Sequence, residues 1–255
     1  REAIEKALEA GIQVVAASGR SLDSLPADIL AISGIQYGIT SNGAAVYRLS
    51  DRKCLKQCKL TKESVREILK YTERQETAFE AFIEGKPYAQ KEYVEDPVRF
   101  GATHRAIPYI QSTREPVADM VSFIYDHQEI LDCLDIVVKS EEKKKELWKT
   151  LRENVKDVYI TSSVTQLLEI SHRDSGKEAG IRFLLEYLGL KREGLAAFGD
   201  GDNDREMLSY AQVGIAMENG SLECKKAADW IAPSNENDGV AWGIEKLLEE
   251  NQSGL

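Results

Sequence analysis

The chain has 255 residues, of which 42% are hydrophobic and 30% are charged, so it can bury a large core and is neither disordered nor low in complexity. Its formal charge of -10 argues against nucleic acid as a partner, because binding a phosphate backbone needs a basic surface. No apolar run approaches the ~18 residues of a membrane span. The four cysteines form no Cys-x-x-Cys pair, which excludes a recognisable zinc site. Such a cysteine pattern is typical of reduced thiols in a cytoplasmic protein.

The first residues predict a helix and then a buried strand. Apolar side chains four apart indicate a helix over residues 2–10, which Gly11 ends. The apolar residues 12–17 follow as a strand whose carboxyl end carries Ser18-Gly19-Arg20. Small polar and cationic side chains at a strand end are a weak sign of a ligand site, and Ser18 could equally cap a helix.

A second strand ends in the same way. The sequence predicts a helix over residues 23–33, ended by Gly34, and a strand over 37–40 that leads into Asn42-Gly43. In a sheet wound from alternating strands and helices, the carboxyl ends of parallel strands meet at one edge. The polar residues at the two strand ends therefore predict a site along that edge.

The regular alternation of strands and helices ends at about residue 58. A helix capped by Thr61 is followed by strands and helices in irregular order, and residues 93–116 are the least regular part of the chain. The mixture predicts an α+β domain at residues 58–171, inserted into an α/β domain made of 1–57 and 172–255. Its further expected elements are a hairpin over 77–84 and 88–90, a strand at 135–139, a helix over 141–154 and an antiparallel strand pair at 158–161 and 166–170.

The regular alternation of strands and helices resumes at residue 172 with a helix that residues 175–180 open, that has Lys177 in its first turn and that Gly189 ends. A cation in the first turn faces the positive end of the helix dipole, which disfavours it there. Lys177 is therefore either a functional group or a solvated surface side chain. Later residues predict strands at 195–199, 213–217 and 230–231, a helix capped by Ser221 and a last helix capped by Asp238.

The strand at 195–199 ends in three aspartates, Asp200, Asp202 and Asp204. One such residue would suffice to cap the next helix, whereas each pair at ~4 Å repels by about 4 kcal/mol at an effective dielectric near 20. A divalent cation would remove that repulsion. Because the nearby ligands are oxygens, with no His or Cys among them, the sequence predicts a Mg²⁺ site here.

Four groups of residues, in this order and spacing, resemble the haloacid dehalogenase superfamily of phosphatases in its Cof-type branch, which carries a class IIB cap. They are Ser18-Gly19-Arg20, Asn42-Gly43, Lys177 and Gly199-Asp200-x-x-Asn203-Asp204. The similarity covers the whole chain. It implies a Rossmann-like, doubly wound, mainly parallel sheet with an inserted α+β cap domain.

The resemblance also implies Mg²⁺-dependent hydrolysis of small phosphorylated metabolites, sugar phosphates by default, through a phosphoaspartyl intermediate. Asp200 would bind Mg²⁺, and the cap, in residues such as 77–110, would set specificity. In the site, Ser18 and Asn203 would bind the phosphoryl group, Lys177 would neutralise its charge and orient the nucleophile, Asp204 would support Lys177 or metal-bound water, and Gly19, Arg20, Asn42 and Gly43 would border the phosphate.

One departure from the family is large. Its first motif, Asp-x-Asp-Gly-Thr, supplies the nucleophile on a strand between those that carry Ser18 and Asp200, and no Asp precedes Ser18 here. We therefore expect the native protein to be longer at its N-terminus and residues 1–255 alone to be inactive. The alternatives are a non-catalytic phosphometabolite-binding or regulatory protein and a sugar phosphomutase. The sequence predicts no membrane partner and leaves the oligomeric state open.

Overall fold

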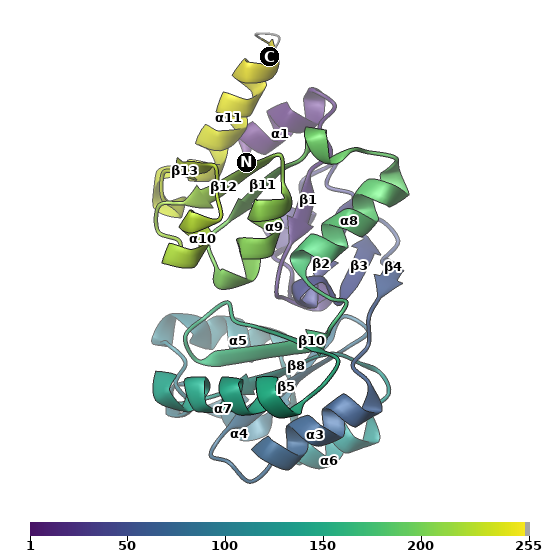
Figure 1. Ribbon diagram of the computed structural model, residues 1–255, viewed down its shortest axis with the longest axis vertical. Helices are drawn as coiled ribbons and strands as arrows, with labels where there is room; N and C mark the ends of the chain where they lie inside the picture. Colours follow the sequence, from purple (N-terminus) through teal and green to yellow (C-terminus); the bar gives the residue numbers. More distant parts are fainter. Residues whose placement is uncertain (253–255) are drawn as a thin grey trace.

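The computed structural model describes residues 1–252, in which the strands form three sheets (Figure 1). The first sheet has the order β1-β2-β3-β4, with β1 and β2 parallel and the other pairs antiparallel. Its strands are Val15–Ala17, Tyr37–Thr40, Ala45–Arg48 and Lys53–Gln57, and helix α1, Glu2–Glu9, precedes them. The sequence analysis missed the hairpin of β3 and β4, and β1 is shorter than the strand predicted over 12–17.

The helix predicted over residues 23–33 is wrong. The structure has only a 3-10 turn, Leu22–Ser24, and a single helical turn, α2, at Ala27–Leu30. Pro26 separates them, because proline lacks an N–H and keeps the residue before it extended; Leu25 has φ -63° and ψ 140°.

The second sheet has six strands in the order β7-β6-β5-β8-β10-β9. The predicted hairpin, the helix over 141–154 and the antiparallel pair β9 and β10 are confirmed, whereas the strand expected at 135–139 begins and ends earlier, and residues 93–116 contain short helices. The bounds are α3 Lys62–Thr72, β5 Ala78–Ile83, β6 Lys86–Gln90, α4 Lys91–Glu95, two 3-10 turns at Pro97–Phe100 and His104–Ala106, α5 Ile107–Thr113, β7 Glu115–Val117, α6 Met120–Asp126, β8 Leu131–Val137, α7 Glu141–Asn154, β9 Val158–Thr161 and β10 Leu167–His172.

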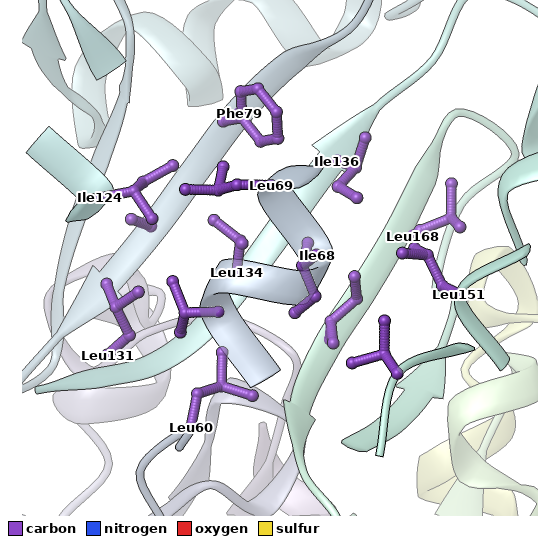
Figure 2. Close-up of a cluster of buried hydrophobic side chains, with 14 of the residues drawn as sticks. Leu60, Ile68, Leu69, Phe79, Ile124, Leu131, Leu134, Ile136, Leu151 and Leu168 are labelled. Atoms are coloured by element: carbon purple, nitrogen blue, oxygen red, sulfur yellow. The ribbon is translucent and has the colours of Figure 1, made fainter. Parts of the chain in front are cut away.

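Helices α3, α6 and α7 cover one face of this second sheet. Figure 2 shows Ile68 and Leu69 of α3 packed over Leu134 and neighbouring apolar side chains of the strands. The Thr61 hydroxyl accepts a hydrogen bond from the Ser64 N–H and so caps α3 as predicted. Because strand residues alternate between faces, the residues between these apolar ones point to the opposite side.

The third sheet, β11-β12-β13, is parallel throughout. The strands and the helices around them follow the prediction closely. Their bounds are α8 Lys177–Leu188, β11 Ala196–Gly199, α9 Arg205–Tyr210, β12 Val213–Met217, α10 Leu222–Lys226, β13 Trp230–Ala232 and α11 Gly239–Gln252. None of the helices in residues 1–252 is long and apolar enough to cross a membrane.

The first and third sheets lie in one layer between two pairs of helices. Helices α8 and α9 pack on Ala17 of β1 and Ala197 of β11. On the other side, α1 and α11 pack on Phe198 of β11 and on Val14, which immediately precedes β1. Within residues 1–252, β1 pairs only with β2, and β11 pairs only with β12. Each strand therefore has one open edge, and the apolar residues of β1 are only half-buried.

Candidate active site

A buried ion pair joins the start of α8 to the loop after β11. The Lys177 Nζ lies 2.5 Å from Asp204 Oδ1, and both side chains are less than a tenth exposed. The other Asp204 oxygen accepts the backbone N–H groups of Asp200, at 2.9 Å, and Gly201, at 3.0 Å. Lys177 is therefore not a surface side chain, and its partner holds the aspartate loop against the strand end.

Asn42 connects the other parts of the site. Its backbone N–H donates to the Ser18 carbonyl at 3.1 Å, and its carbonyl accepts the Gly176 N–H at 2.9 Å. In the side chain, Oδ1 accepts from Asn203 Nδ2 at 2.9 Å, and Nδ2 donates to Glu169 Oε1 at 3.0 Å. One residue that is 1% exposed thus contacts both strand-end loops, the start of α8 and, through Glu169, residues 58–171, the inserted segment that carries the second sheet.

The turn that carries Asn42 has an unusual backbone. Ser41, Asn42 and Gly43 have φ values of 48°, 52° and 84°, so three successive residues are left-handed. For a non-glycine residue this conformation costs about 1–2 kcal/mol, and such strain is found where the surrounding structure enforces it. At Gly43 a Cβ would lie 2.0 Å from the Gly176 carbonyl oxygen, so only glycine fits.

Ser18 and Arg20 form the adjacent loop. The Ser18 hydroxyl oxygen accepts the Arg20 backbone N–H at 3.1 Å, which leaves its O–H free to donate to a ligand. The Arg20 guanidinium donates to the Ser24 carbonyl at 3.4 Å and lies 4.3 Å from the ring centre of Tyr109. Arg20 therefore reaches across to α5 of the inserted segment.

The three aspartates do not gather around one point. Asp204 binds Lys177, and Asp202 Oδ1 accepts from the Ser221 hydroxyl at 2.6 Å. Within residues 1–252, no three or more His, Cys, Asp or Glu side chains are arranged to hold a metal ion. Asp204 and Asp202 thus have side-chain partners within the protein, whereas the charge of Asp204 still acts on Asp200.

Asp200 remains as a carboxylate that no other side chain of residues 1–252 engages. Asp200 is exposed, but partial desolvation of its carboxyl group raises its pKa, with the charge of Asp204 acting in the same direction and that of Lys177 against it. Asp200 also lines a cleft of about 950 Å³ between the aspartate loop and the inserted segment. The cleft walls are Asp200, Gly201, Asp202 and Ser221 on one side and residues of α7 and of the loop 162–165 on the other.

A row of buried acids crosses the face of the second sheet opposite α3, α6 and α7. Glu80 and Glu169 each stand opposite Asp135 on neighbouring strands, and all three are at most 3% exposed. Glu80 forms two hydrogen bonds with Arg114, at 3.1 and 2.8 Å, and burial with the two neighbouring carboxylates raises the pKa of Asp135 well above its usual value. Glu169 reaches the site through Asn42.

Residues 1–244 match the family of haloacid dehalogenase-like hydrolases. The chain belongs to this family. It is 28% identical over 283 residues to the 5-amino-6-(5-phospho-D-ribitylamino)uracil phosphatase YwtE of Bacillus subtilis, with 97% of this chain and 90% of that protein covered. The crystal structure of a haloacid dehalogenase-like hydrolase from Bacillus subtilis superposes with a TM-score of 0.82 at 25% identity, over 96% and 90% of the two chains. The fold is also that of the subclass IIB sugar phosphatase BT4131, with a TM-score of 0.80 at 19% identity over 96% and 89%.

In this haloacid dehalogenase-like hydrolase, the four groups of residues singled out in the sequence lie together, joined by the contacts of Asn42 and Lys177. The sequence analysis missed Glu169, Arg114 and Tyr109. For Glu169 a signal was present, because it is a lone acid between Leu168 and Ile170 in a strand too apolar to face water. For Tyr109 and Arg114, both within the irregular stretch 93–116, the sequence offers no comparable signal.

Proposed function

We propose that this haloacid dehalogenase-like hydrolase is a Mg²⁺-dependent phosphomonoesterase for small phosphorylated metabolites. The observation that carries the proposal is the buried Lys177 ammonium, held by Asp204 beside the Asn42–Asn203 pair and the Ser18 loop. A fixed cation among amide and hydroxyl donors suits a phosphoryl group, whose oxygens take up charge in the transition state. The relative YwtE of Bacillus subtilis, which is named a phosphatase, supports the reaction class.

Each residue then has a role. The Ser18 O–H and the Asn203 amide donate to phosphoryl oxygens, and Lys177 neutralises their charge and orients the attacking carboxylate. Asp204 holds the Lys177 ammonium, and Gly19 and Gly43 let the loops approach one another closely. Arg20 borders the site from the side of Tyr109.

Asp200 fits a Mg²⁺ ligand. It is an oxygen donor at the wall of the cleft, and a bound cation would offset the partial desolvation and the Asp204 charge that raise its pKa. When bound, Mg²⁺ would supply positive charge that offsets the charge of the reacting groups.

The nucleophile, in this proposal, is an aspartate on a strand that lies outside residues 1–255 and inserts between β1 and β11. The support is the pair of open strand edges and the half-buried apolar residues of β1, since buried backbone groups are nearly always hydrogen-bonded. The aspartate oxygen would attack phosphorus as the ester P–O bond breaks and the alcohol leaves. Water would then hydrolyse the phosphoaspartyl group and release phosphate.

We also propose that residues 58–171 are a cap domain that contacts the leaving group. The cleft wall formed by α7 and the loop 162–165 carries ammonium and hydroxyl groups, among them Lys145, Ser163 and Thr165, which favours a polar leaving group such as a sugar or another polyol. Two other candidates follow from the same features. A chain without a nucleophile would be a phosphometabolite-binding protein, and a phosphorylated acceptor that outcompetes water would make the protein a phosphomutase.

The decisive experiment compares residues 1–255 with the full product of the reading frame, using p-nitrophenyl phosphate and Mg²⁺. We expect hydrolysis by the full product only, and equal activity of the two proteins would contradict the proposed strand. A panel of phosphorylated metabolites then identifies the substrate. Phosphate binding without turnover in the full product favours the binding protein, and transfer of phosphate to a sugar phosphate favours the mutase.

A further inference from the structure

We propose that Glu169 and Asn42 are positioning residues that together orient the amide of Asn203, so that the phosphate site is complete only while strand β10 lies against the turn 41–43. The inference rests on the proposed phosphatase function. It assigns to the inserted segment a part in phosphate binding, in addition to any contact with the leaving group.

Two hydrogen bonds, from Asn203 to Asn42 and from Asn42 to Glu169, form what is called the relay, and in each the side chain donates towards Glu169. The Glu169 carboxylate can only accept, so it draws the Nδ2 of Asn42 towards the inserted segment, at 3.0 Å from Oε1. This turns the Asn42 Oδ1 towards Asn203, which must present its Nδ2, at 2.9 Å. The orientation of the first side chain therefore fixes the orientations of the next two.

Both ends of this relay are held. The second Glu169 oxygen accepts the Ser163 backbone N–H, so the carboxylate cannot turn away from Asn42 without losing a bond. At the other end, a Cβ on Gly201 would lie 2.4 Å from Asn203 Oδ1, which shows that this oxygen packs against the Gly201 backbone. The second N–H of the Asn203 amide is then the one left to donate to a phosphoryl oxygen.

Gly19 supports the relay through its missing side chain. A Cβ there would lie 2.8 Å from Glu169 Oε1 and 3.2 Å from each polar atom of the Asn42 amide. The φ of Gly19 lies outside the left-handed region, so the contact, and not the backbone conformation, requires glycine. The loop 18–20 thus leaves room for the hydrogen bond between Asn42 and Glu169.

The arrangement links the position of β10 to phosphate affinity. Glu169 belongs to the inserted segment, whereas Asn42 and Asn203 belong to the loops of the first and third sheets. When β10 moves away, Asn42 loses the carboxylate that sets its orientation, and its amide can turn over. The acceptor opposite Asn203 then becomes a donor, and Asn203 is no longer aimed at the phosphate.

A reversal of the hydrogen-bond direction tests the relay. Glu169→Gln and Asn42→Asp each place like groups face to face in part of the relay, so each should weaken the binding of inorganic phosphate in the presence of Mg²⁺ by about tenfold or more. In the double variant the introduced glutamine accepts from Ser163 and donates to the introduced aspartate, which still accepts from Asn203. We expect phosphate affinity within about threefold of wild type and return of the Asn203 side-chain amide resonance to its wild-type position.

Tyr159→Phe is the matched control, because it removes another contact between the inserted segment and the core, the 3.0 Å hydrogen bond from Tyr159 to Glu206. It should leave phosphate affinity and the Asn203 resonance unchanged. A double variant as weak as the two single effects combined, or a Tyr159→Phe protein as weak as Glu169→Gln, would overturn the relay. All variants are made in the full-length product. If wild type hydrolyses no phosphomonoester while the resonance still responds to Glu169→Gln, the proposed function fails and the relay stands.

Discussion

The ammonium of Lys177 and the carboxylate of Asp204 are in contact although 27 residues separate them in the chain. A lysine in the first turn of a helix faces the positive end of the helix dipole, and burial adds a desolvation cost. The carboxylate offsets both, and its second oxygen is fixed by two backbone N–H groups. The pair therefore places a cation where the sequence alone would disfavour one.

Replacement of this lysine should impair both catalysis and folding. Lys177→Ala removes a charge-assisted bond to the phosphoryl group worth about 1.5–3 kcal/mol, so kcat/KM of the full-length protein should fall by roughly ten- to a hundredfold. It also leaves Asp204 buried without its partner, which should lower the free energy of unfolding by about 3–5 kcal/mol. Steady-state kinetics and urea unfolding measure the two effects. Lys191→Ala, at an exposed lysine beyond the end of α8, is the control and should change neither quantity.

The aspartates of the loop should differ in their response to metal. Asp200→Ala should abolish the Mg²⁺-dependent activity, because in the proposed site Asp200 binds the cation at the cleft wall. Asp202→Asn should retain the Mg²⁺-dependent activity, since the introduced amide oxygen can still accept from the Ser221 hydroxyl. Initial rates over a range of Mg²⁺ concentrations separate the two variants. A normal Mg²⁺ response in Asp200→Ala would exclude Asp200 as a ligand.

Much of this site could be predicted because its residues follow strands in the chain. Apolar runs that end in Ser18 or Asp200 indicate where the loops lie, and parallel strands bring those loops together. The helix at Lys177 was predictable for a similar reason, because Gly189 ends a regular apolar pattern. These features depend on local sequence, and the structure reproduces them closely.

The features that sequence reasoning missed depend on contacts between distant segments. The partner of Asn42 in the inserted segment, Glu169, is 127 residues away, and only the register of β10 against β8 places it on the sheet face opposite α3, α6 and α7. The helix predicted over 23–33 failed for a different reason, because Pro26 within that stretch interrupts a continuous helix. The roles of the aspartates likewise depend on Ser221, which lies beyond β12.

Arg114 and Glu80 form a buried ion pair in the inserted segment. Removing one partner should destabilise the protein more than removing both. Arg114 and Glu80 are 6% and 1% exposed, and Arg114→Met leaves the Glu80 carboxylate without its cation. We expect this variant to lose about 3–5 kcal/mol of unfolding free energy, and the double variant with Glu80→Met to recover most of the loss. Urea unfolding of the four proteins forms a double-mutant cycle. Equal losses in the single and double variants would contradict the prediction.

Asp132 should make stability depend on pH. Burial raises its pKa from 3.8 to about 6, against the hydrogen bonds from Gln57 and the Gly85 N–H and the charge of Lys59. Because the folded state binds this proton more tightly than the unfolded state, the stabilising contribution is complete below about pH 4 and is lost as the pH rises through about 6. The difference corresponds to ~3 kcal/mol. Asp132→Asn cannot titrate, and its loss of the Gly85 hydrogen bond is the same at every pH. Urea unfolding at several pH values from 4 to 7 should therefore show that the variant gains stability relative to wild type as the pH rises, and a constant difference between the two proteins would exclude this role for Asp132.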